Sequence, residues 1–538
     1  MKKYAIFLSL LIVFLGLILP KNALGQTVTE ENIKKNLPHM LGANNVGKEF
    51  WFTIPPCFED ESAGFSNFIK IFITAPTATL VTVEVPGKGF LQTRMTIPND
   101  VIEVNITPVI GQCWTKTAGE KSVPEQVYPG YGIHVIADDP LVVYCVVRYR
   151  YTSDGFLVFP VSSLGREYIV ASYPDMSAMY TGYLEDSPSM CGITAAYDDT
   201  EVFFTLGGNV LTKTAGGVKT GNTISARMNA GDVWLIATMG DEGDVTGSKV
   251  RSSKPVSVVS GNYCTNIPTT NRWCDYTVEM DIPVFTWGQH LHVGKVPGRK
   301  YPSIVRIFAK EPNTKIYRDG KQVGVVQTSG GIIGKGFLEM RMAGMNEGPR
   351  SAVYSGEPDK PIGVTLYNTG VEEDGSPYPN SDPFVMGITP IEQYQKQITF
   401  CTPGIYGATG FPENYLNLVY ETDQDGMIPE DMEFAEVQSG QFVWYKIRSK
   451  FAGIDELFRY DIDGKKFALK LITLPHDGVY MIRGKKPFAC YSFGYSSFDS
   501  YGYPTSAALA DLEKPDTIPP LPIWKAECDG TIKGATVT

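Results

Sequence analysis

The feature of this sequence that most constrains its fold is an internal repeat of about 110 residues. In each copy a polar stretch ends in a proline and is followed by an apolar run. The prolines, which lie 115, 106 and 126 residues apart, are Pro140, Pro255, Pro361 and Pro487. A recurring phrase at a nearly constant period indicates a repeated structural unit. We read the phrase as a strand, a tight turn that ends in proline, and a second strand, because proline pre-sets the turn and needs no partner at a strand's first residue.

A second phrase opens the copies and indicates their type. An apolar run follows a glycine and two further residues at Gly47, Gly165 and Gly288, and a weaker version follows Lys396. Between these phrases, aromatic and β-branched residues alternate with Gly/Pro turns, which is typical of strands. We therefore predict an all-β chain of tandem, Ig-like β-sandwich repeats, about four units in series. A propeller of small blades is the weaker alternative.

The predicted organisation follows from these phrases and from the composition of the two ends. It comprises a signal peptide at 1–25, an N-terminal extension at 26–43, β-sandwich units at 44–160, 161–283, 284–391 and 392–510, and a Pro-rich linker with the start of a possible further module at 511–538.

The N-terminus predicts export from the cell. Lys2 and Lys3 precede an apolar run of about 15 residues, and small residues before Gln26 offer a cleavage site. The run is shorter than the roughly 20 residues that a membrane-spanning helix needs. We therefore expect a secreted or cell-surface protein with no membrane insertion after signal cleavage.

The net charge limits the classes of partner that the protein could bind, and the cysteine content indicates disulfides. The formal net charge is −11, or about −14 without the three leader lysines, which argues against nucleic acid and against anionic lipid. All nine cysteines lie in the mature part, where an oxidising compartment favours disulfides over metal ligation. Cys264 and Cys274 are close enough to staple one loop, 262–275. An odd count leaves one thiol unpaired, for which we favour Cys528.

Residues that could carry chemistry are few, and we predict no enzyme. The sequence has five histidines and no Gly-x-Ser-x-Gly elbow. His290 and His292 lie two apart on an expected strand and could share a metal only if a carboxylate joined them. Asp423-Gln-Asp-Gly and Asp461-Ile-Asp-Gly resemble fragments of calcium loops, but Asp-Gly is also a favoured hairpin turn, which is the interpretation we prefer. No cofactor is expected, with calcium as the alternative.

One aromatic run is a candidate for recognition. Six aromatic residues stand among serines and glycines near the end of the fourth unit, a mixture that resembles antibody paratopes and could also stack on sugars. The competing interpretation is a core strand with a packed loop. The candidate ligand-binding residues are Tyr491, Phe493, Tyr495, Phe498, Tyr501 and Tyr503.

Several phrases together resemble the N-terminal domain family named for the IgG Fc-binding protein, which also occurs in secreted bacterial proteins. They span roughly residues 44–400. The matching pieces include Gly47-Lys-Glu-Phe-Trp, Ser153-Asp-Gly-Phe, Gly261-Asn-Tyr-Cys264, Cys274-Asp275 and Asp382-Pro383. Tyr276 stands where the family usually has a histidine-like position. The segment 500–504 is similar to one common in secreted proteins of Bacteroidetes and their relatives.

The resemblance implies an extracellular binding or adhesion role, and it carries over no IgG-binding residues. We predict a protein that recognises an extracellular glycoprotein or polysaccharide. The alternatives are a structural component of a surface layer or filament, which would self-associate, and a secreted glycan hydrolase with an unrecognised carboxylate pair.

Overall fold

The computed structural model describes residues 45–512, with gaps at 59–67, 117–121, 150–151, 177–185, 241, 332–335, 376–379, 405–410, 498 and 511, and also describes 525–526 and 532–533. The predicted signal peptide and the extension at 26–43 lie outside the described residues, as do Cys528 and most of 511–538. Residues 43–538 form one compact unit. The all-β prediction is confirmed: sheets dominate, and the described helices are single turns.

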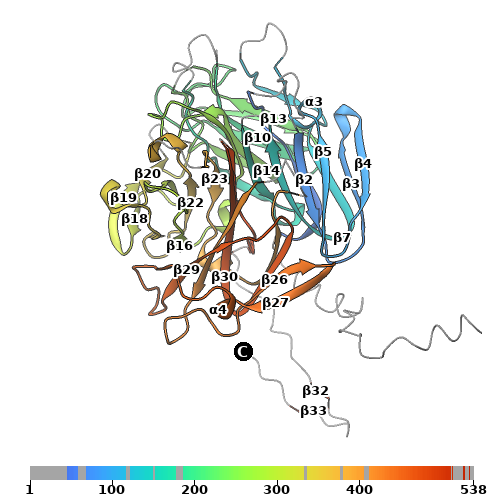
Figure 1. Cartoon of the computed structure of the whole chain (residues 1–538). Helices are drawn as coiled ribbons and strands as arrows, with labels where there is room; N and C mark the ends of the chain where they lie inside the picture. The colour runs from blue at the N-terminus through green and yellow to red at the C-terminus, as the bar shows by residue number, and fades with distance from the viewer. Residues whose placement is uncertain are drawn as a thin grey trace, which may run out of the picture. The chain divides into compact units, whose positions relative to one another are not determined.

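Strands group along the sequence into four sets, which we call the first to fourth repeat (Figure 1). The first repeat contains β1 Gly47–Phe52, β2 Phe68–Thr74, β3 Leu80–Val85, β4 Phe90–Met95, β5 Val101–Ile106, β6 Gln126–Tyr128, β7 Ile133–Arg148 and β8 Ser153–Val158. The second contains β9 Gly165–Ile169, β10 Ser189–Ala195, β11 Thr200–Thr205, β12 Thr223–Met228, β13 Val233–Ala237, β14 Lys249–Thr265 and β15 Asp275–Met280.

The other two repeats follow in the same way. The third contains β16 His290–Val293, β17 Ile304–Ala309, β18 Thr314–Arg318, β19 Lys321–Val326, β20 Phe337–Arg341, β21 Ala352–Ser355, β22 Ile362–Tyr367 and β23 Val385–Gly387. The fourth contains β24 Gln395–Cys401, β25 Glu413–Glu421, β26 Glu433–Gln438, β27 Gln441–Lys446, β28 Glu456–Leu457, β29 Phe467–Thr473, β30 Val479–Ser496 and β31 Asp499–Pro504. The tail has β32 Lys525–Ala526 and β33 Ile532–Lys533. The single-turn helices are α3 Pro108–Gly111, α4 Ile447–Lys450, η1 Pro86–Lys88, η2 Val161–Ser163, η4 Val284–Thr286, η5 Met345–Glu347, η6 Val371–Asp374 and η7 Ile391–Gln393.

Each of three repeats is built around one long strand. Sheet order is β4-β3-β7-β2-β5 in the first repeat, with β1 and β8 also on β7. It is β12-β11-β14-β10-β13-β6 in the second, with β9 and β15 on β14, and β27-β26-β30-β25-β29-β28 in the fourth, with β24 and β31 on β30. The third repeat instead has two four-stranded sheets, β16-β21-β18-β19 and β20-β17-β22-β23. Strand β6 leaves its own repeat and pairs with β13.

The repeated prolines lie inside these long strands, which corrects the turn we expected. Pro140, Pro255 and Pro487 are part of β7, β14 and β30, and only in the third repeat does Pro361 separate two strands. At each embedded proline the neighbouring strand shifts its register, for example between Gly47 and Glu49 opposite β7. Because proline has no N–H to donate to a ladder, such a register shift is the position where a strand tolerates it.

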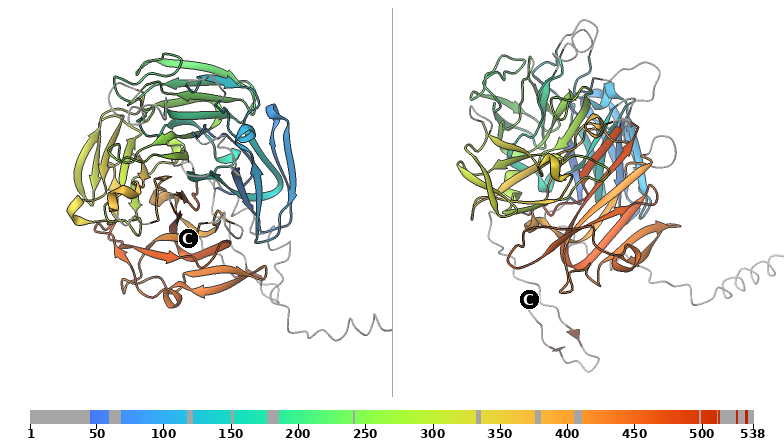
Figure 2. Two further views of the ribbon diagram at one scale, coloured as in Figure 1. Left: turned by 45° about the horizontal axis from the view of Figure 1, so that its top comes forward. Right: turned by 60° about the vertical axis from the view of Figure 1, so that its left-hand side comes forward.

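The last strands of the four repeats pack against one another. Strand β8 contacts β15 and β31, and β23 contacts the same two strands, so that the first and fourth repeats touch although they are furthest apart in sequence (Figure 2). The hydroxyl of Tyr144 donates to the Thr505 oxygen at 2.7 Å, and Arg148 pairs with Asp499. The repeats, which follow in series along the chain, therefore close on one another.

A single buried carboxylate links these four strands. Asp154 on β8 accepts hydrogen bonds from the backbone N–H of Val278 on β15 at 3.0 Å and of Val385 on β23 at 3.3 Å. It also accepts from Gly155 at 2.8 Å and from Gly502 on β31. Burial raises the pKa of Asp154 well above its usual range. The side chain therefore acts as a junction, since its oxygens are the acceptors that these backbone donors use.

Candidate recognition site

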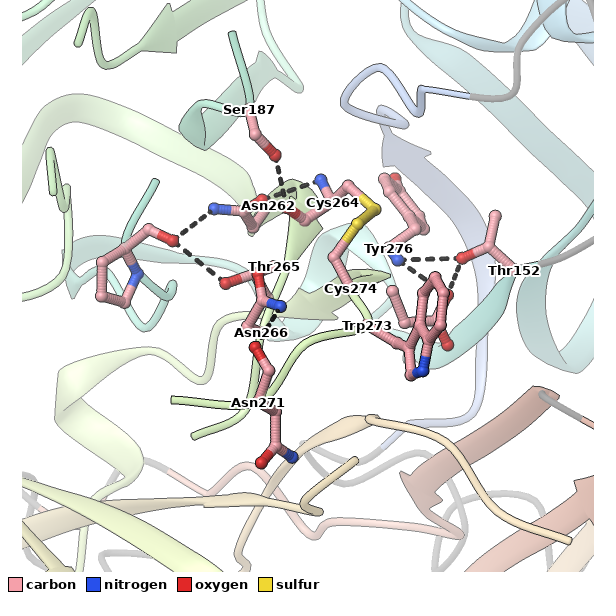
Figure 3. Close-up of a disulfide and its surroundings, with 12 residues drawn as sticks. Thr152, Ser187, Asn262, Cys264, Thr265, Asn266, Asn271, Trp273, Cys274 and Tyr276 are labelled. Carbon is pink, nitrogen blue, oxygen red and sulfur yellow. Dashed lines mark hydrogen bonds between the residues drawn. A yellow bond between two sulfur atoms is a disulfide. The ribbon is translucent and has the colours of Figure 1, made fainter. Parts of the chain in front are cut away.

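The loop between β14 and β15 is closed by a disulfide between Cys264 and Cys274 (Figure 3). This pairing confirms the predicted staple. Of the other cysteines, Cys113, Cys145, Cys191, Cys401 and Cys490 are buried free thiols. The expectation that further cysteines form staples is therefore wrong for these five, which fill apolar core positions, as free cysteine commonly does.

Side-chain amides fix the backbone inside this loop. Asn266 Nδ2 donates to the Asn271 oxygen at 2.7 Å, and Asn271 Nδ2 donates to the Ile267 oxygen at 2.9 Å. The same Ile267 oxygen accepts from the backbone N–H of Gly370 at 2.7 Å, which ties the loop to the third repeat. These bonds hold a nine-residue connection, 266–274, in one shape without regular secondary structure.

Further bonds anchor the loop to the second repeat. Asn262 Nδ2 donates to the oxygens of Tyr173 at 2.9 Å and Pro174 at 3.1 Å, and Thr265 donates to Pro174 at 3.0 Å. The Ser187 hydroxyl donates to the Cys264 oxygen (Figure 3). The loop is thus held at its disulfide, its interior and its base.

The segment 172–174, to which the loop is anchored, is itself held by a buried cation, Arg306. The guanidinium of Arg306, on β17, lies 4.2 Å from the ring centroid of Tyr173 and pairs with Asp244 at 3.0 Å and Glu339 at 2.8 Å. Its Nη1 also donates to the Ser172 oxygen at 2.7 Å. Separating the two repeats would leave the buried charge of Arg306 without its partners in the second repeat, which is costly. These contacts therefore hold the second and third repeats together beside the loop.

The residue after the disulfide turns back into the interior. Asp275 accepts hydrogen bonds from Thr152 and from the Tyr276 backbone N–H, the latter at 2.8 Å. Burial, followed by the nearby carboxyl of Asp382, raises the pKa of Asp275 well above its usual range. Tyr276 is buried and its hydroxyl donates to the Pro55 oxygen at 2.8 Å, so this position is structural in the present chain.

Three residues of the loop face solvent. Thr270, Arg272 and Trp273 are exposed, whereas the segment 261–267 and Asn271 are buried. Trp273 is 55% exposed, and the Arg272 guanidinium lies 5.3 Å from its ring centroid. The backbone N–H of Trp273 donates to Glu372 on η6 at 3.3 Å. A rigid loop therefore presents a tryptophan and an arginine, the residue types most often dominant at protein interfaces.

The predicted aromatic run has a different environment. Tyr491, Phe493, Tyr495, Tyr501 and Tyr503 are all buried, and Phe498 lies outside the described residues. The hydroxyl of Tyr501 donates to Asn414 at 2.7 Å and that of Tyr503 to the Cys401 oxygen at 3.0 Å. Residues 488–495 of β30 and all of β31 are buried on both faces, which is not the solvent-facing placement that a ligand-binding run needs. The interpretation as a core strand fits this placement.

The weaker candidates from the sequence also occupy structural positions. His292 is buried against Phe458 and Phe467, and burial lowers its pKa to about 3, so that it is neutral. Asp425 pairs with Arg448 in a turn, and Asp463 and Gly464 form a second turn with positive φ. Within the described ranges, no group of three or more His, Cys, Asp or Glu side chains is placed to hold a metal ion.

Residues 154–494, more than half of the chain, match the family model described as IgGFc binding protein. The chain belongs to this family. The match contains the disulfide loop and the junction residue Asp154. A human relative named IgGFc-binding protein is 26% identical over 251 residues, which are 45% of this chain and 4% of the human protein. The chain therefore corresponds to a small part of that relative's length.

Among solved structures, a GH78 family rhamnosidase of Bacillus sp. GL1 aligns with this IgGFc-binding family chain at 9% identity and a TM-score of 0.11. The alignment covers 86% of this chain and 55% of the rhamnosidase chain. A score this low supports neither a common fold nor a common activity. In the part of the chain that the structure describes, no helix is long and apolar enough to cross a membrane.

Sequence reasoning identified the disulfide but not Trp273 as the exposed residue of the loop. The position of Trp273 directly before Cys274 could have indicated its exposure, because a side chain next to a disulfide in a short loop has limited room to fold inward.

Proposed function

We propose that this chain is a secreted binding protein that recognises an extracellular glycoprotein through the disulfide loop, with Trp273 and Arg272 as the principal contacts. The observation that carries the proposal is the exposed tryptophan on a loop fixed by a disulfide and by side-chain bonds. Family membership supports a binding role, and the predicted signal peptide at 1–25 supports an extracellular location.

The rigidity of the loop bears directly on affinity. A flexible loop loses conformational entropy when it binds, whereas a pre-organised one does not. In the free protein, Asn266, Asn271 and Glu372 already hold the backbone around Trp273. Tryptophan adds a large contact area and a single N–H donor, which suits a mixed polar and apolar surface such as that of a glycoprotein.

The test is binding of the purified protein to an immobilised panel of immunoglobulin G, its Fc fragment, mucins and polysaccharides. We expect saturable binding to a glycoprotein, and we expect Trp273→Ala to weaken it by about 30-fold or more, the effect of a hot-spot residue worth about 2 kcal/mol. Tyr197→Ala is the matched control, because Tyr197 is 43% exposed but lies in a different loop of the second repeat.

Two results would contradict the proposal. One is a folded Trp273→Ala variant with unchanged affinity. The other is wild-type protein that binds no glycoprotein of the panel.

A further inference from the structure

The fourth repeat carries a second aromatic surface, far along the sequence from the disulfide loop, and its two rings, Phe442 and Trp444, are half-buried. On the face of its sheet opposite the core residue Phe434, two rows of side chains run across adjacent strands (Figure 1 shows β26, β27 and β30). The aligned residues of the charged row are Gln397, Arg483, Glu433 and Lys446. Those of the second row are Thr399, Met481, Ala435 and Trp444. We call these two rows the sheet platform.

Trp444 is held on this platform by a cation. The Arg483 guanidinium carbon lies 3.7 Å from the centroid of the Trp444 ring, across the small side chain of Ala435 on the intervening strand. Glu433 fixes the guanidinium, since it accepts from Arg483 Nε and lies 2.7 Å from Nη2. Phe442, two residues earlier on β27, lies 6.1 Å from Trp444 between ring centroids. The aromatic ring and the planar cation thus form one ordered surface at the edge of the sheet.

Charge on the platform is locally positive. Lys446 Nζ lies 2.9 Å from the same Glu433, so that two cations share one carboxylate. Both cations are about half exposed, at 50% for Lys446 and 47% for Arg483. Glu433 occupies the Nε–Nη2 side of the guanidinium, and the described residues place no partner on Nη1. One formal positive charge therefore remains in a chain whose net charge is −11.

We propose that the sheet platform binds a carboxylated sugar, such as a uronic or sialic acid residue of a glycan. The C–H face of the sugar ring packs against the side of the Trp444 ring that Arg483 does not cover, and its carboxylate reaches past the ring edge to pair with Lys446 and with the free edge of Arg483. A planar guanidinium suits this role because it can engage two carboxylates on different edges. Aromatic rings prefer partners with electropositive edges, and the C–H groups of a pyranose supply them.

This site is independent of the glycoprotein site proposed above, because Trp273 and Trp444 lie in different repeats on unrelated strands. Each variant therefore reports on one site. Trp273→Ala should leave binding of the free sugar probes unchanged.

The experiment titrates the full protein with two matched probe pairs by isothermal calorimetry. The pairs are sialyllactose with lactose, and oligogalacturonate with its methyl ester, in which the same rings lack the charge. We expect the acidic member of at least one pair to bind at least tenfold more tightly. Added salt should reduce this preference, because both cations are exposed.

Variants separate the two contacts. Trp444→Ala should weaken binding of the acidic probe at least tenfold, and Trp444→Phe should restore part of it. Arg483→Gln should remove the preference for the acidic member. Leu457→Ala is the control for an exposed apolar residue of the same repeat, at 46% exposure. The proposal is overturned if neither acidic probe binds, if neutral and acidic probes bind equally, or if the folded Trp444 variants bind as the wild type does.

Discussion

Replacing Asp154 tests whether one carboxylate holds the four repeats together. Asp154→Ala would leave up to four buried backbone N–H groups, on Gly155, Val278, Val385 and Gly502, without their acceptor. An unsatisfied buried group costs about 1–3 kcal/mol. Removal of a desolvated carboxyl offsets part of this cost, so we expect a loss of about 4 kcal/mol. A typical domain has only about 5–15 kcal/mol of stability in total.

The assay is urea unfolding of Asp154→Ala and Asp154→Asn, followed by circular dichroism and tryptophan fluorescence. The amide retains one acceptor oxygen, so Asp154→Asn should lose roughly half as much as the alanine variant. The control is Asp138→Ala, an exposed aspartate on β7, which should change stability by less than about 0.5 kcal/mol. Equal stability of Asp154→Ala and Asp138→Ala would refute the junction role.

Two further predictions concern pH and the disulfide. Burial raises the pKa of Asp281 to about 8. The folded state therefore keeps a proton that an unfolded aspartate releases at about pH 4. As pH rises between these two values, the free energy of unfolding should fall. Asp281→Asn should make this slope shallower in urea titrations at pH 5 to 8.5, and an unchanged slope would exclude Asp281 as one of its sources. Replacing Cys264 and Cys274, which are 10 residues apart, by alanine should cost about 2.5–3 kcal/mol in unfolding experiments. The same variant should bind the glycoprotein more weakly, and full affinity would show that loop rigidity is not needed.

Much of the local structure could be predicted from the sequence. Alternating residues such as Val81, Val83 and Val85 indicate a strand with one buried face, and they are buried on β3. The opening phrases at Gly47 and Gly165 begin strands β1 and β9. These features depend on neighbours within a few residues, which the sequence displays directly.

Packing between repeats could not be predicted in this way. The run that includes Tyr491 and Tyr501 alternates with serine and glycine, and that pattern fits an exposed strand as well as one buried on both faces. Burial is decided by the contact of β31 with β8, more than 300 residues earlier in the chain. Trp273 shows the reverse case, because its exposure depends on the bonds that hold the loop outward and not on its own residue type.

The contact between β8 and β31 also limits how such a chain can change its length. An open array gains or loses one repeat at its end and keeps the interfaces of the others. Here the first and last repeats are neighbours through Arg148 and Asp499, so deletion of any one repeat would strip two others of a partner. Longer proteins that contain this architecture should therefore grow by whole sets of four or by unrelated domains, and not by single repeats.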